Sequence, residues 1–256
     1  MDLLVREWQA FLTALQFLTR IRFCEQTNLT VDDFGRSTRY FTIIGLILGG
    51  IYFGLGKGLL YLLGSANLVI AMLVLLPVCL TGGLMLDGFM DTADGVFSGR
   101  DRERQLEIMK DSRVGSFGAI ALGSLLLINW SALRDIPLEV IPIVLLLMPL
   151  IGRLAMVMVI TAFPYARKEG MGKIFAARAN KWTLMFAGLI VILAVIPFGV
   201  TAILALAIGL FTAWFLADWL TDKLGGLTGD TYGAIETITE IAVLLVYWLE
   251  CNSWNW

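Results

Sequence analysis

Long apolar runs separated by short charged segments dominate the sequence. A transmembrane helix needs about 20 mainly apolar residues, and six runs approach or exceed this length: residues 40–63, 66–86, 117–133, 136–163, 182–217 and 234–249. The fifth run, as one helix, would extend roughly 54 Å at about 1.5 Å per residue. Because the hydrocarbon core is only about 30 Å thick and Pro197 lies near the middle of this run, we expect two spans joined by a tight turn. The pattern predicts an all-α bundle of about seven transmembrane helices.

The N-terminal segment, residues 1–23, has a different pattern. Its apolar residues recur at helical spacing among charged ones, and none of its apolar stretches is long enough to span a bilayer. A cleavable signal peptide is not expected, because the small-residue cleavage pattern is missing. We therefore expect an amphipathic helix lying in the membrane interface. Residues 1–256 are expected to form a single integral membrane domain.

Lysine and arginine residues alternate between the expected loops. They cluster before the first span and after the second, fourth and sixth, whereas the opposite loops hold only Arg134, with Lys57 near a span end. Positively charged loops stay in the cytoplasm. The pattern predicts a multi-pass protein of the cell inner membrane, with the N-terminus cytoplasmic and the C-terminus outside.

Composition supports the membrane assignment and narrows the chemistry. Apolar residues make up 58% of the chain and charged residues 16%, against about 25% charged in ordinary soluble domains. The net charge of -2 gives no basic excess, so no nucleic acid is expected as a partner. The chain has no histidine, which excludes histidine-assisted nucleophiles and histidine-bearing zinc sites. Acid–base chemistry must use carboxylates, lysine or tyrosine, and any metal must accept oxygen ligands.

Glycines recur along the first expected span. Five of them form overlapping small-xxx-small spacings: Gly45, Gly49, Gly50, Gly54 and Gly58. Such spacing lets helix backbones approach closely. We expect this helix to pack closely, either within the monomer or at the interface of a homo-oligomer.

Three aspartates follow the second expected span. Asp87, Asp91 and Asp94 stand at positions i, i+4 and i+7, so they share one face if the helix continues through them. Three carboxylates this close repel one another, and the repulsion grows near a membrane boundary. Mg²⁺ would relieve it, because this ion takes carboxylates together with phosphate oxygens and water. We expect the three aspartates to bind Mg²⁺ and to be catalytic.

A basic segment follows at residues 100–118. Lys110 and Arg113 are expected to hold substrate phosphates beside the aspartates, as phosphoryl transfer requires. Asp111 lies between them and is assigned to the same substrate-binding segment. Arg102 and Arg104 are expected on a solvated helix face.

A third polar segment covers residues 224–240, where a glycine-rich turn opens a helix. Free backbone N–H groups and the helix dipole at such an entry suit a phosphate or a metal-bound water, so Thr228 and Asp230 are expected to bind substrate. Glu236 and Glu240 lie one turn apart inside an apolar span, where ionisable groups are functional candidates. We expect this segment to share an active site with the aspartates.

Four segments together, residues 82–95, 106–113, 163–172 and 225–240, resemble the cobalamin synthase family in their order and spacing. The resemblance implies a Mg²⁺-dependent integral membrane enzyme, an adenosylcobinamide-GDP ribazoletransferase. Such an enzyme joins adenosylcobinamide-GDP to α-ribazole, or to α-ribazole 5′-phosphate, and releases GMP late in cobalamin biosynthesis. The resemblance also adds Arg167 to the expected substrate-binding residues. Met85 stands where many members have histidine, so no essential side chain is expected there.

The residues and the resemblance agree on a mechanism. A ribazole hydroxyl attacks the cobinamide-bearing phosphorus of the pyrophosphate, and GMP leaves. One of the three aspartates, or Glu236 or Glu240, accepts the hydroxyl proton, and the sequence leaves open which. The catalytic segments 82–118, 163–173 and 224–240 are expected together at the cytoplasmic face.

Two other functions fit the sequence less well. A CDP-alcohol phosphotransferase also uses membrane-edge aspartates with Mg²⁺, but its usual motif places Ala-Arg after Asp-Gly-x-x, and residues 87–91 lack it. A secondary transporter could use Arg153, Glu236 and Glu240 as a midplane ion site. No internal repeat supports a transporter, and the charges are concentrated in one set of loops.

Overall fold

The computed structural model describes residues 3–22, 30–64 and 67–253, and within them the fold is helical with no β-strand. The all-α expectation is confirmed. The helices are α1 (Leu3–Leu18), α2 (Val31–Ser37), η1 (Thr38–Tyr40), α3 (Phe41–Leu63), α4 (Asn67–Thr81), α5 (Leu84–Phe97), α6 (Arg102–Ile108), α7 (Ser116–Asp135), α8 (Ile141–Ala162), α9 (Met171–Arg178), α10 (Lys181–Val195), η2 (Ile196–Phe198), α11 (Gly199–Leu224) and α12 (Gly229–Asn252).

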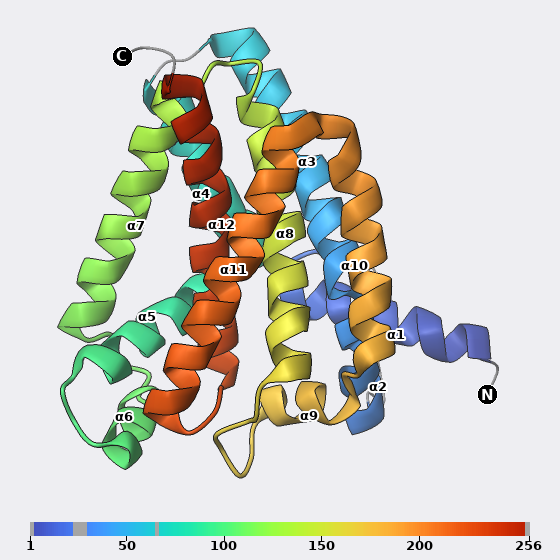
Figure 1. Cartoon of the computed structure of the whole chain (residues 1–256), viewed down its shortest axis with the longest axis vertical. Coiled ribbons are helices and arrows are strands. Elements are labelled where there is room, and N and C mark those ends of the chain that lie inside the picture. The colour runs from blue at the N-terminus through green and yellow to red at the C-terminus, as the bar shows by residue number, and fades with distance from the viewer. Residues whose placement is uncertain (1–2, 23–29, 65–66, 254–256) are drawn as a thin grey trace.

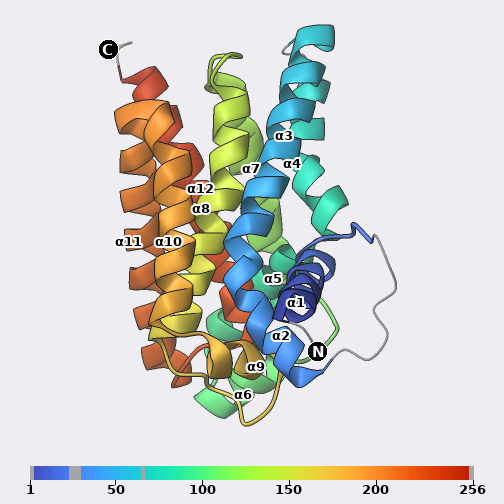
Figure 2. The same cartoon turned by 90° about the vertical axis from the view of Figure 1, so that its right-hand side faces the viewer.

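Helix α8 is the centre of the bundle, with α3, α10, α11 and α12 packed around it (Figures 1 and 2). Most of its side chains are buried. The sequence explains this position, because α8 is apolar on every face and a helix of that kind is stable only when it is surrounded. Arg153 is the one charged residue of α8, and it is buried as well.

The glycines of α3 are used for packing against α8. A Cβ atom on Gly45 would lie 2.6 Å from the carbonyl oxygen of Pro149, and one on Gly49 would collide with the carbonyl of Leu146. Close packing within the monomer is therefore confirmed. A Cβ atom on Gly50, Gly54 or Gly58 would meet no atom of another helix within 4 Å, and a homo-oligomer through this face stays a hypothesis.

The expected count of seven spans is not confirmed. Among the described residues, four helical stretches are long and apolar enough to cross a membrane, or five if α4 and α5 form one bent span. One of the four, Lys181–Leu224, contains the turn at η2, where the chain reverses as expected (Figure 1). Helices α4 and α10 have 15 residues each, fewer than the about 20 that a span needs, and α12 contains acidic residues.

The short helices α2, α5, α6 and α9 gather at one end of the bundle, the lower end in Figures 1 and 2. We call it the charged end, because two loops rich in charged residues, 98–115 and 163–170, lie there. The C-terminal end of α3, the α7–α8 connection and the α10–α11 turn lie at the opposite end. Helix α1 lies crosswise near the charged end, as an interfacial helix would.

The second expected span bends before it reaches the aspartates, which lie together on a separate helix, α5. Helix α4 ends at Thr81, and α5 begins at Leu84 at an angle of 96° to it. Gly82 and Gly83 make the bend with φ values of 70° and 75°, a conformation that side chains other than glycine disfavour. The backbone N–H of Arg20 donates a 2.7 Å hydrogen bond to the carbonyl of Leu80, so the end of α1 supports the bend.

Candidate active site

Helices α5 and α12 cross at a backbone-to-backbone contact at the charged end. A Cβ atom on Gly88 would lie 2.7 Å from the carbonyl oxygen of Asp230, and one on Gly233 would lie 2.9 Å from that of Met85. Glycine on both helices is what permits this approach. The crossing brings Asp87 and Asp230, which are far apart in sequence, to the wall of one cavity.

The segment after α8 is joined to the entry of α12. The N–H of Leu227 donates to the carbonyl of Pro164, and the N–H of Ala166 donates to the carbonyl of Leu227, both at 2.8 Å. Tyr165 and Leu227 thereby form an isolated parallel β-bridge. This connection places the guanidinium of Arg167 2.8 Å from the carboxylate of Asp230. Parts of the segments 82–118, 163–173 and 224–240 therefore lie in contact with one another.

A cavity of about 210 Å³ lies between these segments, and we call it the site cavity. Asp87, Asp230 and Arg167 are its charged lining residues. The remaining lining is apolar, aromatic or glycine, contributed by α1, α3, α5, α8, α9 and α12. The site cavity thus combines a charged part with a large apolar wall, as small-molecule binding sites commonly do.

The carboxylates around the site cavity outnumber the cations that pair with them. Asp87 is exposed and Asp91, one helical turn later, is half-buried. Arg167 pairs with Asp230, whereas Asp87 and Asp91 have no ion-pair partner in the part of the chain that the structure describes. Two carboxylates at i and i+4 on one helix repel each other. Their arrangement favours a cation.

Asp94 does not join its neighbours, which corrects the expectation that all three aspartates form one ligand set. Its two carboxylate oxygens accept the backbone N–H groups of Gly115 and Gly118, each at 2.8 Å. These N–H groups open α7, so the carboxylate also meets the positive end of that helix dipole. Asp94 is only 8% exposed. It holds α7 against α5.

No group of three or more Asp, Glu, Cys or His side chains within the described residues is arranged to hold a metal ion. Mg²⁺ does not require such a group, because it commonly takes one or two carboxylates and completes its shell with substrate phosphates and water. Asp87 and Asp91, both without a partner among the described residues, fit that mode of binding. The magnesium site stays a prediction, now with two aspartates as ligands.

Thr228 is a helix cap and not an exposed contact for substrate. Its side-chain oxygen accepts the N–H of Thr231 at 3.2 Å, and the Thr231 hydroxyl accepts the N–H of Thr228 at 2.7 Å. Both residues are fully buried. This reciprocal capping fixes the start of α12 and so fixes Asp230 in its first turn. The substrate-binding role expected for Thr228 is corrected to a structural one.

Tyr165 meets the same helix entry from the other side. Burial raises the pKa of its phenol, and the raising is partly offset by Arg167 and by backbone N–H groups of Gly229 and Lys173 that hydrogen-bond to it. The helix entry expected to bind phosphate is thus partly occupied by Thr228 and Tyr165. Asp230 remains the charged residue of this turn that lines the site cavity.

The basic segment forms a second hollow of about 470 Å³, which we call the loop cavity. Asp111 and Arg113 line it with Asp94, and Lys110 is exposed nearby. Arg113 pairs with Asp111 at 2.7 Å and holds the pKa of that carboxyl at about 2. Asp94 thus lines the loop cavity, whereas Asp87 on the same helix lines the site cavity. The substrate-binding role of Lys110, Asp111 and Arg113 stays a prediction.

Arg102 has a more defined position than a solvated face would give it. A Cβ atom on Gly225 would collide with its guanidinium group, so Arg102 lies directly over the glycine that ends α11. Gly225 has a φ of 71°, a left-handed conformation that favours glycine over residues with a side chain. Arg104 pairs with Glu107 at 2.7 Å on the exposed surface, as expected.

Glu236 and Glu240 lie deeper in the bundle than Asp230. Both pair with Arg153 of α8, and Gly152 leaves room for them, since a Cβ atom there would lie 3.1 Å from Glu240. Glu236 follows Asp230 by six residues, or about 9 Å along the helix. Buried ion pairs of this kind are costly to break. The catalytic role expected for these glutamates stays a prediction, and their observed partner is Arg153.

Sequence reasoning missed the aromatic wall of the site cavity. Phe17, Phe41 and Phe175 come from α1, α3 and α9, with ring centroids 5.1 Å apart for Phe17–Phe175 and 5.3 Å for Phe41–Phe175. Tyr165 and Tyr232 lie on the same cavity with centroids 6.4 Å apart. Single phenylalanines in apolar helices carry no signal of a site. Only the fold gathers them.

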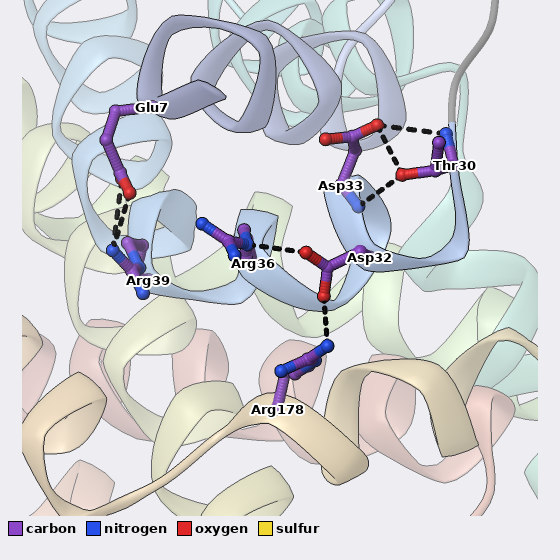
Figure 3. Close-up of polar contacts among 7 residues, drawn as sticks. All are labelled: Glu7, Thr30, Asp32, Asp33, Arg36, Arg39 and Arg178. Carbon is purple, nitrogen blue, oxygen red and sulfur yellow. Dashed lines mark hydrogen bonds and ion pairs between the residues drawn. The ribbon is translucent and has the colours of Figure 1, made fainter. Parts of the chain in front are cut away.

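Polar contacts join α2 and η1 to the helices that carry this wall (Figure 3). Asp32 pairs with Arg178 at the end of α9 and, at 2.8 Å, with Arg36. Arg39 pairs with Glu7 of α1 at 3.0 Å. Helix α2 thus contacts α9 through Asp32, and η1 contacts α1 through Arg39; α1 and α9 are the helices that contribute Phe17 and Phe175.

The fold and site define a helical membrane protein with an acidic cavity at one end. Comparison with known proteins is more specific. The family model described as cobalamin-5-phosphate synthase matches residues 10–248, and the chain belongs to this family.

Curated relatives cover nearly the whole chain. Proteins named adenosylcobinamide-GDP ribazoletransferase from Desulforamulus reducens and Clostridium botulinum (strain Langeland) are 39% and 38% identical over 239 and 238 residues. The alignments cover 91% and 92% of this chain and 93% and 96% of the relatives. A relative of the same name from Roseiflexus sp. is 39% identical over 90% of this chain and 86% of its own. No solved structure matches.

Proposed function

We propose that this protein is a membrane-bound transferase that joins adenosylcobinamide-GDP to α-ribazole, or to α-ribazole 5′-phosphate, and releases GMP. The relatives named for this activity support it across the chain. The observation that carries it is the placement of Asp87 at the wall of the site cavity together with the Arg167–Asp230 pair, with Asp91 one helical turn away on α5. Carboxylates next to a fixed guanidinium are suited to a metal-assisted reaction of a pyrophosphate.

The reaction exchanges one phosphoester partner for another. A ribose hydroxyl oxygen of the ribazole forms a bond to the phosphorus that carries cobinamide. The bond from that phosphorus to the bridging oxygen breaks, and GMP leaves with the electron pair. The hydroxyl proton passes to a carboxylate, for which Asp230 is placed at the cavity wall.

The residues divide the work. Asp87 and Asp91 would hold Mg²⁺, which when bound neutralises phosphate charge and stabilises the leaving oxygen. Arg167 orients Asp230 and adds a positive charge near the phosphates. Gly88 and Gly233 keep α5 and α12 close together. The aspartates of α5 and the Arg167–Asp230 pair can therefore act on one substrate.

The charged end is proposed to face the cytoplasm, in the cell inner membrane. The support is the basic residues in loops 98–115 and 163–170 and the charge of the nucleotide substrate, which cannot cross a bilayer unaided. Cys251 at the far end of α12 then faces outward. A membrane-impermeant thiol reagent should label it in right-side-out vesicles and not in inverted ones. The reverse result would invert this topology.

The activity is tested by GMP release from adenosylcobinamide-GDP and α-ribazole, using protein purified into lipid nanodiscs with Mg²⁺. We expect GMP and adenosylcobalamin in equal amounts and no GMP when ribazole is omitted. The Asp87→Asn protein at the same concentration is the control for contaminating hydrolases. GMP release that does not depend on ribazole would point to a hydrolase and overturn the proposal.

A further inference from the structure

The site cavity has two chemically different parts. Its apolar part is formed by Phe17, Phe41 and Phe175, with Met156 and Ile160 from α8. Phe41 is fully buried and Phe175 almost so. Flat aromatic ligands are favoured in such a place, because aromatic rings pack edge-to-face or offset with additional gain beyond the area they bury.

The other part holds the polar groups. Asp87 and Asp230 are at the cavity wall with Arg167. The Tyr232 hydroxyl also belongs to a lining residue, and it is buried with no hydrogen-bond partner in the described residues. Tyr232 is only 3% exposed. Buried hydroxyls are normally paired, so a ligand atom that accepts its O–H would satisfy it.

We propose that the site cavity binds the nucleophilic substrate, with the flat bicyclic base of α-ribazole against the three phenylalanines and the ribose toward Asp87 and Asp230. This inference rests on the proposed function and names the subsite of one of its two substrates. A cavity of about 150 Å³ holds a benzene ring. The site cavity, at about 210 Å³, offers the larger space that two fused rings need, while the ribose extends toward the opening.

The arrangement assigns a role to each end of the ligand. The unsubstituted ring nitrogen of the base is a hydrogen-bond acceptor and takes the O–H of Tyr232. The ribose hydroxyls then lie beside carboxylates that can accept a proton. The corrinoid, which is far too large for this cavity, must bring its pyrophosphate from outside. The apolar wall would thus hold the nucleophile in place before the second substrate arrives.

The test uses Tyr232→Phe, with Tyr247→Phe as a matched control. Tyr247 is on the same helix, is also buried, and its hydroxyl likewise lacks a partner among the described residues, but it does not line the site cavity. Tyr232→Phe should raise the KM for α-ribazole about 2- to 10-fold, the range for loss of one hydrogen bond. The KM for adenosylcobinamide-GDP should not change. Tyr247→Phe should alter neither.

Binding of α-ribazole alone to the nanodisc-embedded protein separates this inference from the proposed function. The expected result is saturable binding, weakened by Tyr232→Phe and by Phe175→Leu, and not by Phe11→Leu, whose ring packs on Trp8 and Tyr40 and does not line the site cavity. A purine riboside should bind less well, because its extra polar atoms must be buried without partners. An inactive wild-type protein would contradict the function. An active one whose ribazole binding and KM are insensitive to Tyr232→Phe and Phe175→Leu would contradict the subsite.

Discussion

Arg167 and Asp230 form an ion pair of 2.8 Å that joins the loop after α8 to the first turn of α12. The side chains are 13% and 24% exposed, so the pair is partly withdrawn from water and is screened less than a surface pair. The β-bridge between Tyr165 and Leu227 joins the same two segments a few residues earlier in each. Two segments that are about 60 residues apart in sequence thereby act as one wall of the site.

Removing this pair should reduce turnover more than stability. We expect Arg167→Ala and Asp230→Ala each to lower kcat/KM by about 10²–10³, the usual cost of losing one electrostatic contact to the reacting group. The double variant should lose much less than the product, because residues that act as a unit are non-additive. GMP release at matched protein concentration measures all three. Multiplicative losses would show that the two residues act separately.

Arg167→Lys provides a sharper control. Lysine keeps the positive charge but loses the planar fork that meets a carboxylate or phosphate. We expect it to recover only a small part of the activity that Arg167→Ala loses. Recovery to the wild-type level would mean that charge alone is required.

Asp94 and Asp91 should behave differently although they are three residues apart. Asp94→Ala removes the acceptor of the Gly115 and Gly118 N–H groups, and we expect the free energy of unfolding to fall by about 1–3 kcal/mol. Asp91→Ala should leave the free energy of unfolding nearly unchanged and reduce turnover strongly. Thermal unfolding in nanodiscs and GMP release distinguish the two effects.

A matched control for Asp94 is Asp101, which caps α6 by accepting the N–H of Arg104 at 2.9 Å. It is exposed, so Asp101→Ala should cost about 0.5–1 kcal/mol. Equal stability losses for Asp94→Ala and Asp101→Ala would contradict the special position of Asp94 between α5 and α7.

Metal dependence should follow Asp87 and Asp91. We expect chelation to abolish GMP release and Mg²⁺ to restore it, with Ca²⁺ restoring little because it prefers a looser shell of more oxygen ligands. In Asp87→Asn or Asp91→Asn the Mg²⁺ concentration for half-maximal activity should rise by about tenfold or more. Asp94→Asn should leave it unchanged. A shift caused by Asp94→Asn alone would restore the three-aspartate site.

The contact between α2 and α9 should depend on packing more than on its ion pair. Arg178 and Asp32 are 58% and 36% exposed, and surface pairs contribute about 0–1 kcal/mol. Asp32→Asn should therefore have little effect on activity. A Cβ atom on Gly35 would collide with the Arg178 side chain and lie 3.2 Å from the Ile174 carbonyl.

Gly35→Val should consequently displace α9 and, with it, Phe175. We expect this variant to raise the KM for α-ribazole several-fold without changing membrane insertion. The two KM values and the amount of protein extracted from membranes are the measurements. If Asp32→Asn proves as harmful as Gly35→Val, the ion pair and not the packing positions α9.

The sequence by itself determined the class of the protein and the location of its chemistry. The apolar runs fixed an all-α bundle, because the length and hydropathy of a span are properties of a local stretch of chain. The alternation of basic loops and the polar segments 82–118, 163–173 and 224–240 can likewise be recognised from local sequence alone. In the structure these segments lie at one end of the bundle.

The tertiary structure alone decided what each polar residue contacts. Asp87 and Asp94 are the same residue type on the same short helix, yet one lines the cavity and the other caps α7. The bend at Gly82 and Gly83 rotates α5 away from α4, and no periodicity reveals such a rotation. The phenylalanines of the cavity come from three helices. Hydropathy is set residue by residue, whereas the partner of a carboxylate or a ring is set by contacts between segments distant in sequence, and these exist only once the helices have packed.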